Sequence, residues 1–472
     1  SDGACPSLLL EPTSTNKIKY SEEFANVYWT KSGSSIQGDP STEGAEEITN
    51  GDFATDSDWT KGTGWTIAGG VASSDGTNSP LDQFSVTTIG KTYKVDITVI
   101  NMTTSSVNVR LGGGSSDIIG SIESNGTYTF YGTVANSTTF RIRANTGFDG
   151  SIDNVSVKEV QGFVSPSGTT SAFKLVEDTS TGAHRNYTAS ITASIGTDYV
   201  ISCYAKKGER NYISIQNITA ENIITYFDLN NGLVLGSTGS PVSSKITSLA
   251  NGWYKCEMVV NPTIASVRPA IYVSSTGSNE SYTGDGTSGV YIYGAQVEQQ
   301  SYATSYIKNE GTALGVTRAA DTANGAGNSS TFNDSEGVLM AEISFPSATT
   351  SSNLRIAISD TTANNRVLIQ NISAFANRLQ FYVIVGGVTS TDFNLNINDI
   401  AIPNKIAFKY KENDFSIWIN GIKVLTDTSG ITFPNGTLTE LAFDGGDGGF
   451  DFYGNTKQIQ YFDSALNDSD LE

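Results

Sequence analysis

Residues 20–31 read Tyr20-Ser-Glu-Glu-Phe24-Ala-Asn-Val-Tyr-Trp29-Thr-Lys31, and residues 50–61 read Asn50-Gly-Asp-Phe53-Ala-Thr-Asp-Ser-Asp-Trp59-Thr-Lys61. Each stretch places a Phe, a short turn and then a Trp, which we interpret as the opening of a β-sandwich. Two later stretches, 150–159 and 289–298, alternate like closing strands. The segment between the two openings is too short to complete a sandwich. We therefore expect one sandwich to be nested inside another.

This nesting predicts three domains in 472 residues, which agrees with about 100–200 residues per domain. The outer sandwich is expected at 1–43 plus 162–308, the inserted domain at 44–161 and a third domain at 309–472. An exposed loop tolerates such an insertion at little entropic cost. Short alternating runs separated by Gly, Asn, Asp and Ser recur throughout the chain. They predict an all-β fold of three β-sandwich or jelly-roll domains, one inserted into another.

The charge of the chain limits its partners. Its 48 acidic and 28 basic residues give a formal net charge of −20 and a pI near 4.4. This balance disfavours nucleic acid, which requires clustered Lys and Arg, and anionic membrane surfaces. No apolar run approaches the roughly 18 residues of a membrane span. A neutral polysaccharide, calcium or solubility alone is compatible with the charge. The three cysteines, Cys5, Cys203 and Cys256, are too few for a disulfide framework.

Several strings of the outer sandwich resemble a recurring module of bacteriophage virion proteins such as tail and head fibres. The strings are Pro6-Ser-Leu-Leu-Leu-Glu-Pro12, Tyr20-Ser-Glu-Glu-Phe24, Ala205-Lys-Lys-Gly-Glu-Arg-Asn-Tyr212, Asn251-Gly-Trp-Tyr-Lys-Cys256 and Tyr282-Thr-Gly-Asp-Gly-Thr-Ser-Gly289. The inserted domain resembles jelly-roll carbohydrate-binding modules through residues 50–53 and 152–157. The third resembles the concanavalin A/laminin G-like sandwich through its Trp418-Ile-Asn-Gly421 hairpin and residues 465–471. These resemblances imply fold more directly than ligand, because sites are grafted on folds.

The sequence contains few residue patterns typical of catalytic sites. We therefore expect no catalytic residue and no enzyme activity. His184 is the only histidine, there is no Gly-x-Ser-x-Gly motif, and no strand carries the paired carboxylates of a glycosidase. A polysaccharide lyase could use His184 with Arg185, Tyr187 or Lys206, but single residues carry no specificity.

Sugar binding requires exposed aromatic faces, on which the apolar faces of pyranose rings stack. Trp59 and Trp65 in the inserted domain are the candidates, together with Tyr128 and Tyr131. Core burial stays an alternative for Trp65, because Trp65-Thr-Ile67 also alternates. The other three tryptophans (Trp29, Trp253 and Trp418) lie within alternating runs and are expected in cores.

The jelly-roll resemblance implies a structural calcium ion between the first and last strands of the inserted domain, with Asp52 and Asp153 as ligands. Ordinary turn and surface roles are the alternatives. Asp285 and the group Asp444, Asp447 and Asp451 are weaker candidates, for which turn chemistry is favoured.

Together these observations predict a non-catalytic phage virion appendage, a fibre or decoration protein at the virion surface or outside the cell. Its sandwiches are expected to bind host-surface or environmental carbohydrate and to contact other virion proteins. Two alternatives stay open: an accessory binding region of a polysaccharide lyase or hydrolase, and a purely structural virion protein. Whether the chain forms a homo-oligomer is not readable from the sequence, which shows no coiled-coil heptads.

Overall fold

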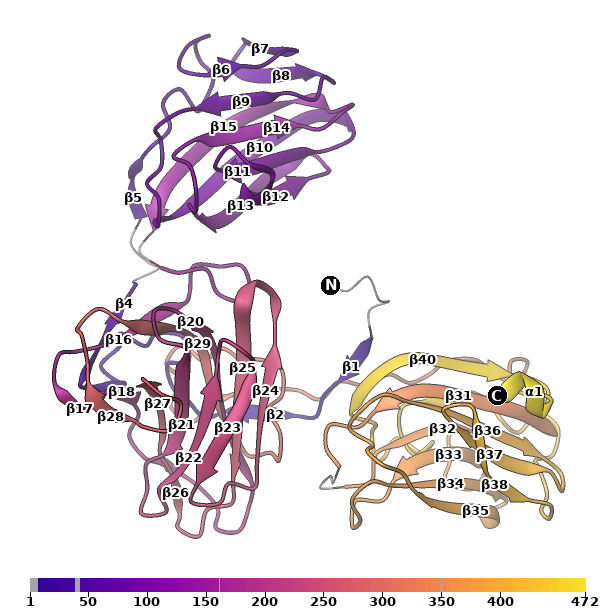
Figure 1. Ribbon diagram of the computed structural model, residues 1–472. Helices are drawn as coiled ribbons and strands as arrows, with labels where there is room; N and C mark the ends of the chain where they lie inside the picture. Colours follow the sequence, from indigo (N-terminus) through magenta and orange to yellow (C-terminus); the bar gives the residue numbers. More distant parts are fainter. Residues whose placement is uncertain (1–6, 39–42, 161, 349, 351) are drawn as a thin grey trace. The chain divides into compact units, whose positions relative to one another are not determined.

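The computed structural model describes residues 7–38, 43–160, 162–348, 350 and 352–472. These residues form β-strands joined in antiparallel ladders, with one short α-helix, α1 (Asp468–Leu471), among them. Figure 1 shows the strands stacked in layers within each domain. The all-β prediction of three sandwiches, one inserted into another, is confirmed. The described residues include no helix that is long and apolar enough to cross a membrane.

The inserted domain, here called the insert, is a sandwich of two sheets. The first sheet has the order β13-β10-β15-β8-β7, with β5 also paired to β15, and the second has the order β12-β11-β14-β9-β6. The strands are β5 (Glu43–Glu46), β6 (Thr60–Lys61), β7 (Trp65–Ala68), β8 (Val71–Asp75), β9 (Pro80–Gln83), β10 (Thr92–Thr104), β11 (Val107–Leu111), β12 (Ile118–Ile122), β13 (Gly126–Thr133), β14 (Phe140–Ala144) and β15 (Asp149–Val160). Alternate residues of these strands point into one core.

The outer sandwich is assembled from strands on both sides of the insert. Its sheets have the orders β24-β25-β20-β29-β16-β4 and β23-β22-β21-β27-β18-β3. The strands are β3 (Thr30–Ser32), β4 (Ser34–Gln37), β16 (Phe173–Glu177), β18 (Arg185–Tyr187), β20 (Tyr199–Lys207), β21 (Tyr212–Asn217), β22 (Ile223–Asp228), β23 (Leu233–Thr238), β24 (Ser243–Ser248), β25 (Trp253–Val260), β27 (Pro269–Ser274) and β29 (Gly289–Glu298). β4 pairs with β16 and β3 pairs with β18. Strands before the insert therefore complete sheets formed mainly by strands after it.

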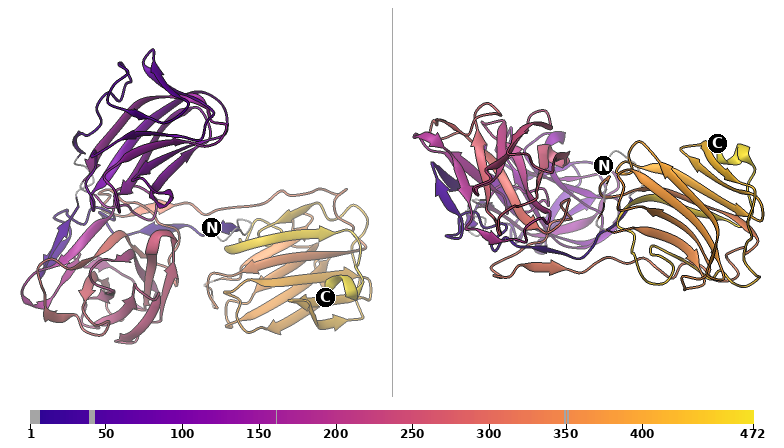
Figure 2. Two further views of the ribbon diagram at one scale, coloured as in Figure 1. Left: turned by 45° about the horizontal axis from the view of Figure 1, so that its top comes forward. Right: turned by 90° about the horizontal axis from the view of Figure 1, so that it is seen from below.

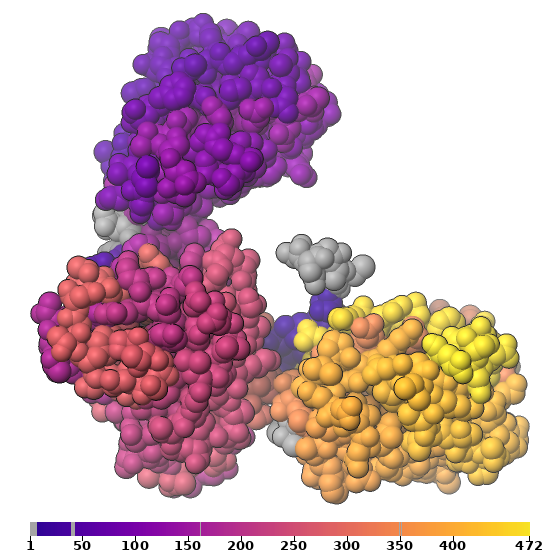
Figure 3. Space-filling view, in the orientation of Figure 1, coloured from indigo at the N-terminus to yellow at the C-terminus, as the bar shows by residue number. Residues whose placement is uncertain are grey.

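The C-terminal sandwich has the sheet orders β1-β40-β31-β36-β37-β38 and β35-β34-β33-β32-β39. Figures 2 and 3 show it in orange to yellow, except for β1, which is indigo. The strands are β1 (Leu8–Leu10), β31 (Glu336–Ser344), β32 (Arg355–Ser359), β33 (Arg366–Asn371), β34 (Arg378–Val385), β35 (Val388–Asn396), β36 (Asn404–Lys411), β37 (Phe415–Ile419), β38 (Ile422–Asp427), β39 (Glu440–Ala442) and β40 (Gly454–Phe462).

The first strand of the chain departs from the expected domain boundary. Sequence analysis assigned residues 1–43 to the outer sandwich, but β1 pairs with β40 in the C-terminal sheet. Leu10 is buried in the C-terminal core, while Leu8 and Leu9 are exposed. β1 covers the open edge of β40, whose backbone groups would otherwise be unpaired. In agreement, the chain divides into two compact units. The unit that contains the C-terminal sandwich consists of residues 7–15, 300–305 and 317–472, and the second unit consists of residues 16–299 and 306–316.

Short two-stranded pairs complete the fold. They are β2 (Ser14–Asn16) with β30 (Val316–Arg318), β17 (Thr181–Ala183) with β28 (Ser281–Thr283), and β19 (Ile191–Thr192) with β26 (Ser266–Val267). Two single-turn 3₁₀ helices, η1 (Ser115–Asp117) and η2 (Ala250–Gly252), lie in connections.

Candidate functional site

Both tryptophans expected to bind sugar lie in the core of the insert. Trp59 is 7% exposed and Trp65 is 5% exposed. The Trp65 indole N–H donates to the carbonyl of Ser79 at 3.0 Å, and its ring packs near that of Phe148. The Trp59 indole donates to the carbonyl of Asn50. The expectation of an exposed stacking face is therefore wrong for Trp59, and for Trp65 the alternative of core burial holds, because each ring lies in the core of the insert.

The two tyrosines do not form a common platform. Both lie on β13, where side chains alternate between the two faces of the sheet. Tyr128 is opposite the buried Ile97, points toward the core side and stacks parallel to Phe130 at 6.3 Å between ring centroids. Tyr131 is opposite Lys94 and points to the other face. A single pyranose ring cannot contact both rings at once.

Asp52 and Asp153 lie on adjacent segments, as the calcium prediction requires. The N–H of Val155 donates to the carbonyl of Gly51 at 2.8 Å. Each carboxylate accepts a local backbone N–H, from Ala54 for Asp52 and from the following Asn154 for Asp153. The described residues contain no group of three or more His, Cys, Asp or Glu that could hold a metal. The donor set is small for a cation that takes six to eight oxygens, and calcium stays a prediction.

His184 lies in a buried polar cluster of the outer sandwich. Its side chain is fully buried, and its two ring nitrogens face the backbone carbonyls of Gly33 and Tyr282. Nearby, the buried Glu177 receives two hydrogen bonds from Arg210, one from the Tyr282 hydroxyl and one from a backbone N–H. Burial alone would raise the pKa of Glu177, but these hydrogen bonds outweigh it and lower the pKa. The cluster ties strands together, and the imidazole contacts these two carbonyls and the Asp178 carboxylate, 3.5 Å from Nδ1.

The weaker acidic candidates have local partners. Asp285 accepts the backbone N–H groups of Thr287 and Ser288 and both of their hydroxyls, which is turn chemistry. Asp444 is buried and accepts the N–H of Gly446, and burial followed by neighbouring carboxylates raises its pKa. Asp451 accepts the Tyr453 hydroxyl.

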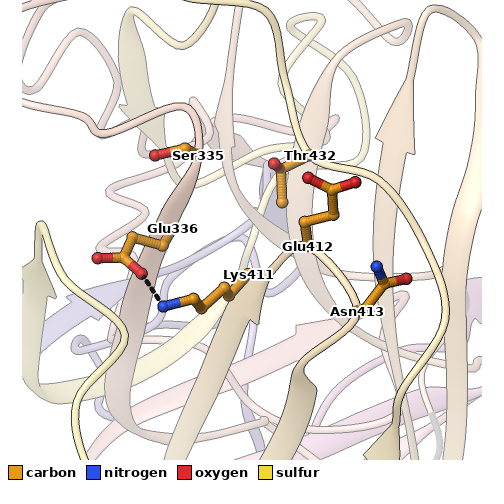
Figure 4. Close-up of a pocket in the computed structure, with 6 residues that line it drawn as sticks. All are labelled: Ser335, Glu336, Lys411, Glu412, Asn413 and Thr432. Atoms are coloured by element: carbon orange, nitrogen blue, oxygen red, sulfur yellow. Dashed lines mark ion pairs between the residues drawn. The ribbon is translucent and has the colours of Figure 1, made fainter.

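A shallow hollow of about 330 Å³ lies in the C-terminal sandwich (Figure 4). It is lined by Ser335, Glu336, Lys411, Glu412, Asn413 and Thr432. The Glu336–Lys411 ion pair, 2.7 Å between Oε2 and Nζ, spans part of it. None of the six side chains is aromatic, so the hollow offers no surface on which a sugar ring could stack.

A different face of the insert gathers positive charge. On the outward side of the sheet β12-β11-β14-β9-β6, one cross-strand row contains Ile118, Arg110, Arg141, Asp82 and Thr60. The next outward row contains Ser121, Asn108, Arg143 and Pro80. The inward residues between these rows, such as Val109 and Ile142, belong to the core. We call the outward set Asn108, Arg110, Arg141, Arg143 and Asp82 the arginine face.

Two arginines of the face are held by the neighbouring loop and by Asp82. Arg141 donates from Nε and Nη2 to both oxygens of Asp82, each at 2.7 Å, and from Nη1 to the carbonyl of Gly113. Arg110 donates from Nη1 to the carbonyl of Gly114 at 3.0 Å. Burial, followed by the charges of Arg143 and Arg141, lowers the pKa of Arg110. The side chains are thus fixed before any ligand arrives.

Two guanidinium groups retain unused donors. Arg110 is only 8% exposed, and its Nε is buried without a hydrogen-bond partner. Arg143 is half-buried, and its side chain forms no hydrogen bond or ion pair with the described residues. A buried donor without a partner costs free energy, so a ligand oxygen that reached it would be favoured.

The sequence analysis did not predict the arginine face, although the spacing of two of its arginines could have indicated it. Residues 107–111 and 139–143 both alternate between apolar and polar side chains as strands do, and the period of two places Arg141 and Arg143 on one face. That Arg110 joins them depends on the register between β11 and β14, which the sequence does not display.

No protein-family model and no curated protein matches the chain. Among solved structures it is similar to the CBM40 module of a Ruminococcus gnavus IT-sialidase bound to α2,3-sialyllactose, with 14% identity over 32% of this chain and 91% of that one, at a TM-score of 0.26. It is also similar to domains LG4-5 of the mouse laminin α1 chain, with 9% identity over 61% and 92%, at a TM-score of 0.21. A tandem CBM22 pair from Paenibacillus barcinonensis Xyn10C has 10% identity over 55% and 99%, at a TM-score of 0.23. Because these TM-scores are low, we draw the function from the residues of this chain.

Proposed function

We propose that this chain is a non-catalytic carbohydrate-binding protein and that the arginine face of the insert is its glycan site. The observation that carries the proposal is a sheet face on which Arg110 and Arg141 are already held in place, with donors left unused on Arg110 and Arg143. Sugar hydroxyls both donate and accept hydrogen bonds. The guanidinium groups of Arg110 and Arg143 supply donors, and the side-chain carbonyl oxygen of Asn108 supplies an acceptor.

Preorganisation supports binding at this face. Arg141 and Asp82 hold each other in a two-point ion pair, and loop carbonyls hold the guanidinium groups of Arg141 and Arg110. Such side chains lose little conformational freedom when a ligand binds, so more of the contact energy remains as affinity.

Steric blocking tests this proposal independently of charge. Ser121 is exposed on β12 directly opposite Asn108, so Ser121→Trp places a large ring on the face. The control is Thr127→Trp, at an exposed position on β13 in the other sheet. On a glycan array, the intact chain should bind at least one glycan, Ser121→Trp should lose that binding and Thr127→Trp should keep it. Absence of binding by the intact chain would refute the proposal, and equal binding by both variants would refute the site.

We further propose that the chain acts as a phage virion appendage, a fibre or decoration protein outside the cell that contacts other virion proteins. Support comes from the strings of the outer sandwich that resemble virion modules, including residues 205–212 and 251–256. Mass spectrometry of purified particles, together with the neighbouring genes, tests this. Detection in particles beside capsid or tail proteins is expected. Absence from particles would contradict it.

The proposal assigns no catalytic role to the chain. Incubation with polysaccharides, followed by measurement of reducing ends and of unsaturated-uronate absorbance, tests this part. Product that accumulates in proportion to enzyme concentration would favour the lyase or hydrolase alternative instead.

A further inference from the structure

The arginine face carries more positive than negative charge, in a chain whose net charge is −20. Three guanidinium groups, from Arg110, Arg141 and Arg143, share it with the carboxylates of Asp82 and the neighbouring Asp117. Both carboxylate oxygens of Asp82 accept hydrogen bonds from Arg141. Asp117 accepts hydrogen bonds from the N–H of Gly114 and from Ser116 and Asn136. Neither carboxylate forms an ion pair with Arg110 or Arg143.

The register places these two arginines as diagonal neighbours. Arg110 is directly opposite Arg141, and Arg143 is directly opposite Asn108. Arg110 and Arg143 therefore lie on adjacent strands with a register offset of two residues, on the same face of the sheet. Diagonal pairs on one face of a sheet have their Cα atoms roughly 7–8 Å apart, within reach of long side chains. Their mutual repulsion contributes to the lowered pKa of Arg110. A bound anion would relieve this repulsion and would accept hydrogen bonds from both guanidinium groups.

We propose that the glycan bound at this face is acidic, with a carboxylate or sulfate group bridging Arg110 and Arg143. This inference rests on the proposed function and names its ligand class. Guanidinium groups match both anions because their planar N–H donors form paired hydrogen bonds to two oxygens. Hydroxyl groups of the same or the next sugar would contact Asn108 and Ser121 in the adjacent row.

The experiment uses the full chain and three probes. Oligogalacturonate carries carboxylates, its fully methyl-esterified form has the same ring hydroxyls without the charge, and sulfated dextran carries sulfate. Isothermal titration calorimetry measures each affinity for the unchanged protein, for Arg143→Gln and for Lys91→Gln. Lys91 is a matched control, because it lies at the start of the other sheet of the insert and is paired with Glu159. Both variants lose one positive charge, and melting curves verify that each is folded.

The inference predicts tighter binding of at least one acidic probe than of the neutral ester, with affinity that falls as NaCl rises. Arg143→Gln should weaken the preferred acidic probe about tenfold or more, as expected for loss of hydrogen bonds to a charged group, and should weaken the neutral ester by a much smaller factor. Lys91→Gln should change neither. The two acidic probes distinguish carboxylate from sulfate.

Three results would overturn the inference. If neutral glycans bind as tightly as acidic ones and Arg143→Gln has no effect, the acidic ligand class is wrong while carbohydrate binding stands. If Arg143→Gln and Lys91→Gln weaken acidic probes equally, the attraction is not localised at this face. If no glycan binds, the proposed function fails together with the inference.

Discussion

Truncation of Trp65 distinguishes a core residue from a ligand platform. Trp65→Ala removes an indole that is 5% exposed and packed near Phe148 between the two sheets of the insert. Trp→Ala changes in cores cost about 3–5 kcal/mol. The Ser79 carbonyl that accepts the indole N–H also accepts the backbone N–H of Ala144, so the change leaves no orphaned acceptor. We therefore expect the loss of packing alone, without a further hydrogen-bond penalty.

Differential scanning calorimetry of the full chain measures this cost. The chain contains three separate large cores, so its unfolding is not expected to be two-state, and one transition should belong to the insert. For a domain of this size, about 3–5 kcal/mol corresponds to a decrease of roughly 10–20 °C in the midpoint. Only the insert transition should move. Trp65→Phe keeps a ring and loses the indole hydrogen bond, so it should produce a much smaller decrease.

Phe84→Ala is the matched control, since it removes an aromatic ring of the insert that is 59% exposed. It should move the transition by less than about one fifth of the Trp65→Ala shift, in keeping with surface substitutions. The reasoning would be refuted if Trp65→Ala left every transition in place and abolished glycan binding. That result would mean that the indole lies at the surface as a stacking platform.

Three further predictions concern groups outside the arginine face. Glu177→Gln should lower the midpoint of the outer sandwich by an amount equivalent to about 3 kcal/mol at pH 7, because it breaks a buried charge pair. The folded-state pKa of Glu177 is lowered, so its contribution to stability is present above the unfolded pKa and is lost as pH falls. The midpoint of the variant should therefore decrease less steeply with falling pH than that of the unchanged protein. Burial raises the pKa of the Cys203 thiol to about 12 and raises that of the Cys256 thiol well above its usual value. In a Cys5→Ser background neither thiol should therefore react with a thiol reagent at pH 8 until the chain is unfolded, and rapid reaction in the native state would contradict this. If calcium binds at the predicted site, added calcium should raise the insert midpoint and Asp52→Asn should abolish the increase, whereas an unchanged midpoint would count against the ion.

The fold class was predictable because its signal is local. Alternating runs such as residues 92–99 and 253–260 became β10 and β25, with one face of each strand in a core. The position of β1 was not predictable in the same way. Three leucines at residues 8–10 form an apolar run without alternation, and only the free edge of β40 decides which sheet they join.

The candidate site was harder to predict, since exposure of an aromatic ring is not a local property. Trp59 and Trp65 have the residue type of sugar platforms, yet both are buried in the core of the insert. Arginines were not considered as candidate site residues, although the spacing of Arg141 and Arg143 already places both on one face of a strand.

The sequence by itself determined that the chain is all-β, that one sandwich interrupts another, and which residues of each strand share a face, because the period of two belongs to the extended backbone. Only the tertiary structure decided which of those faces is covered and which is open. It buried Trp59 and Trp65 between the sheets, and it brought Arg110 beside Arg141 and Arg143 through the register of β11 on β14. Register and burial depend on contacts between strands distant in the sequence, and the alternation within one strand carries no information about them.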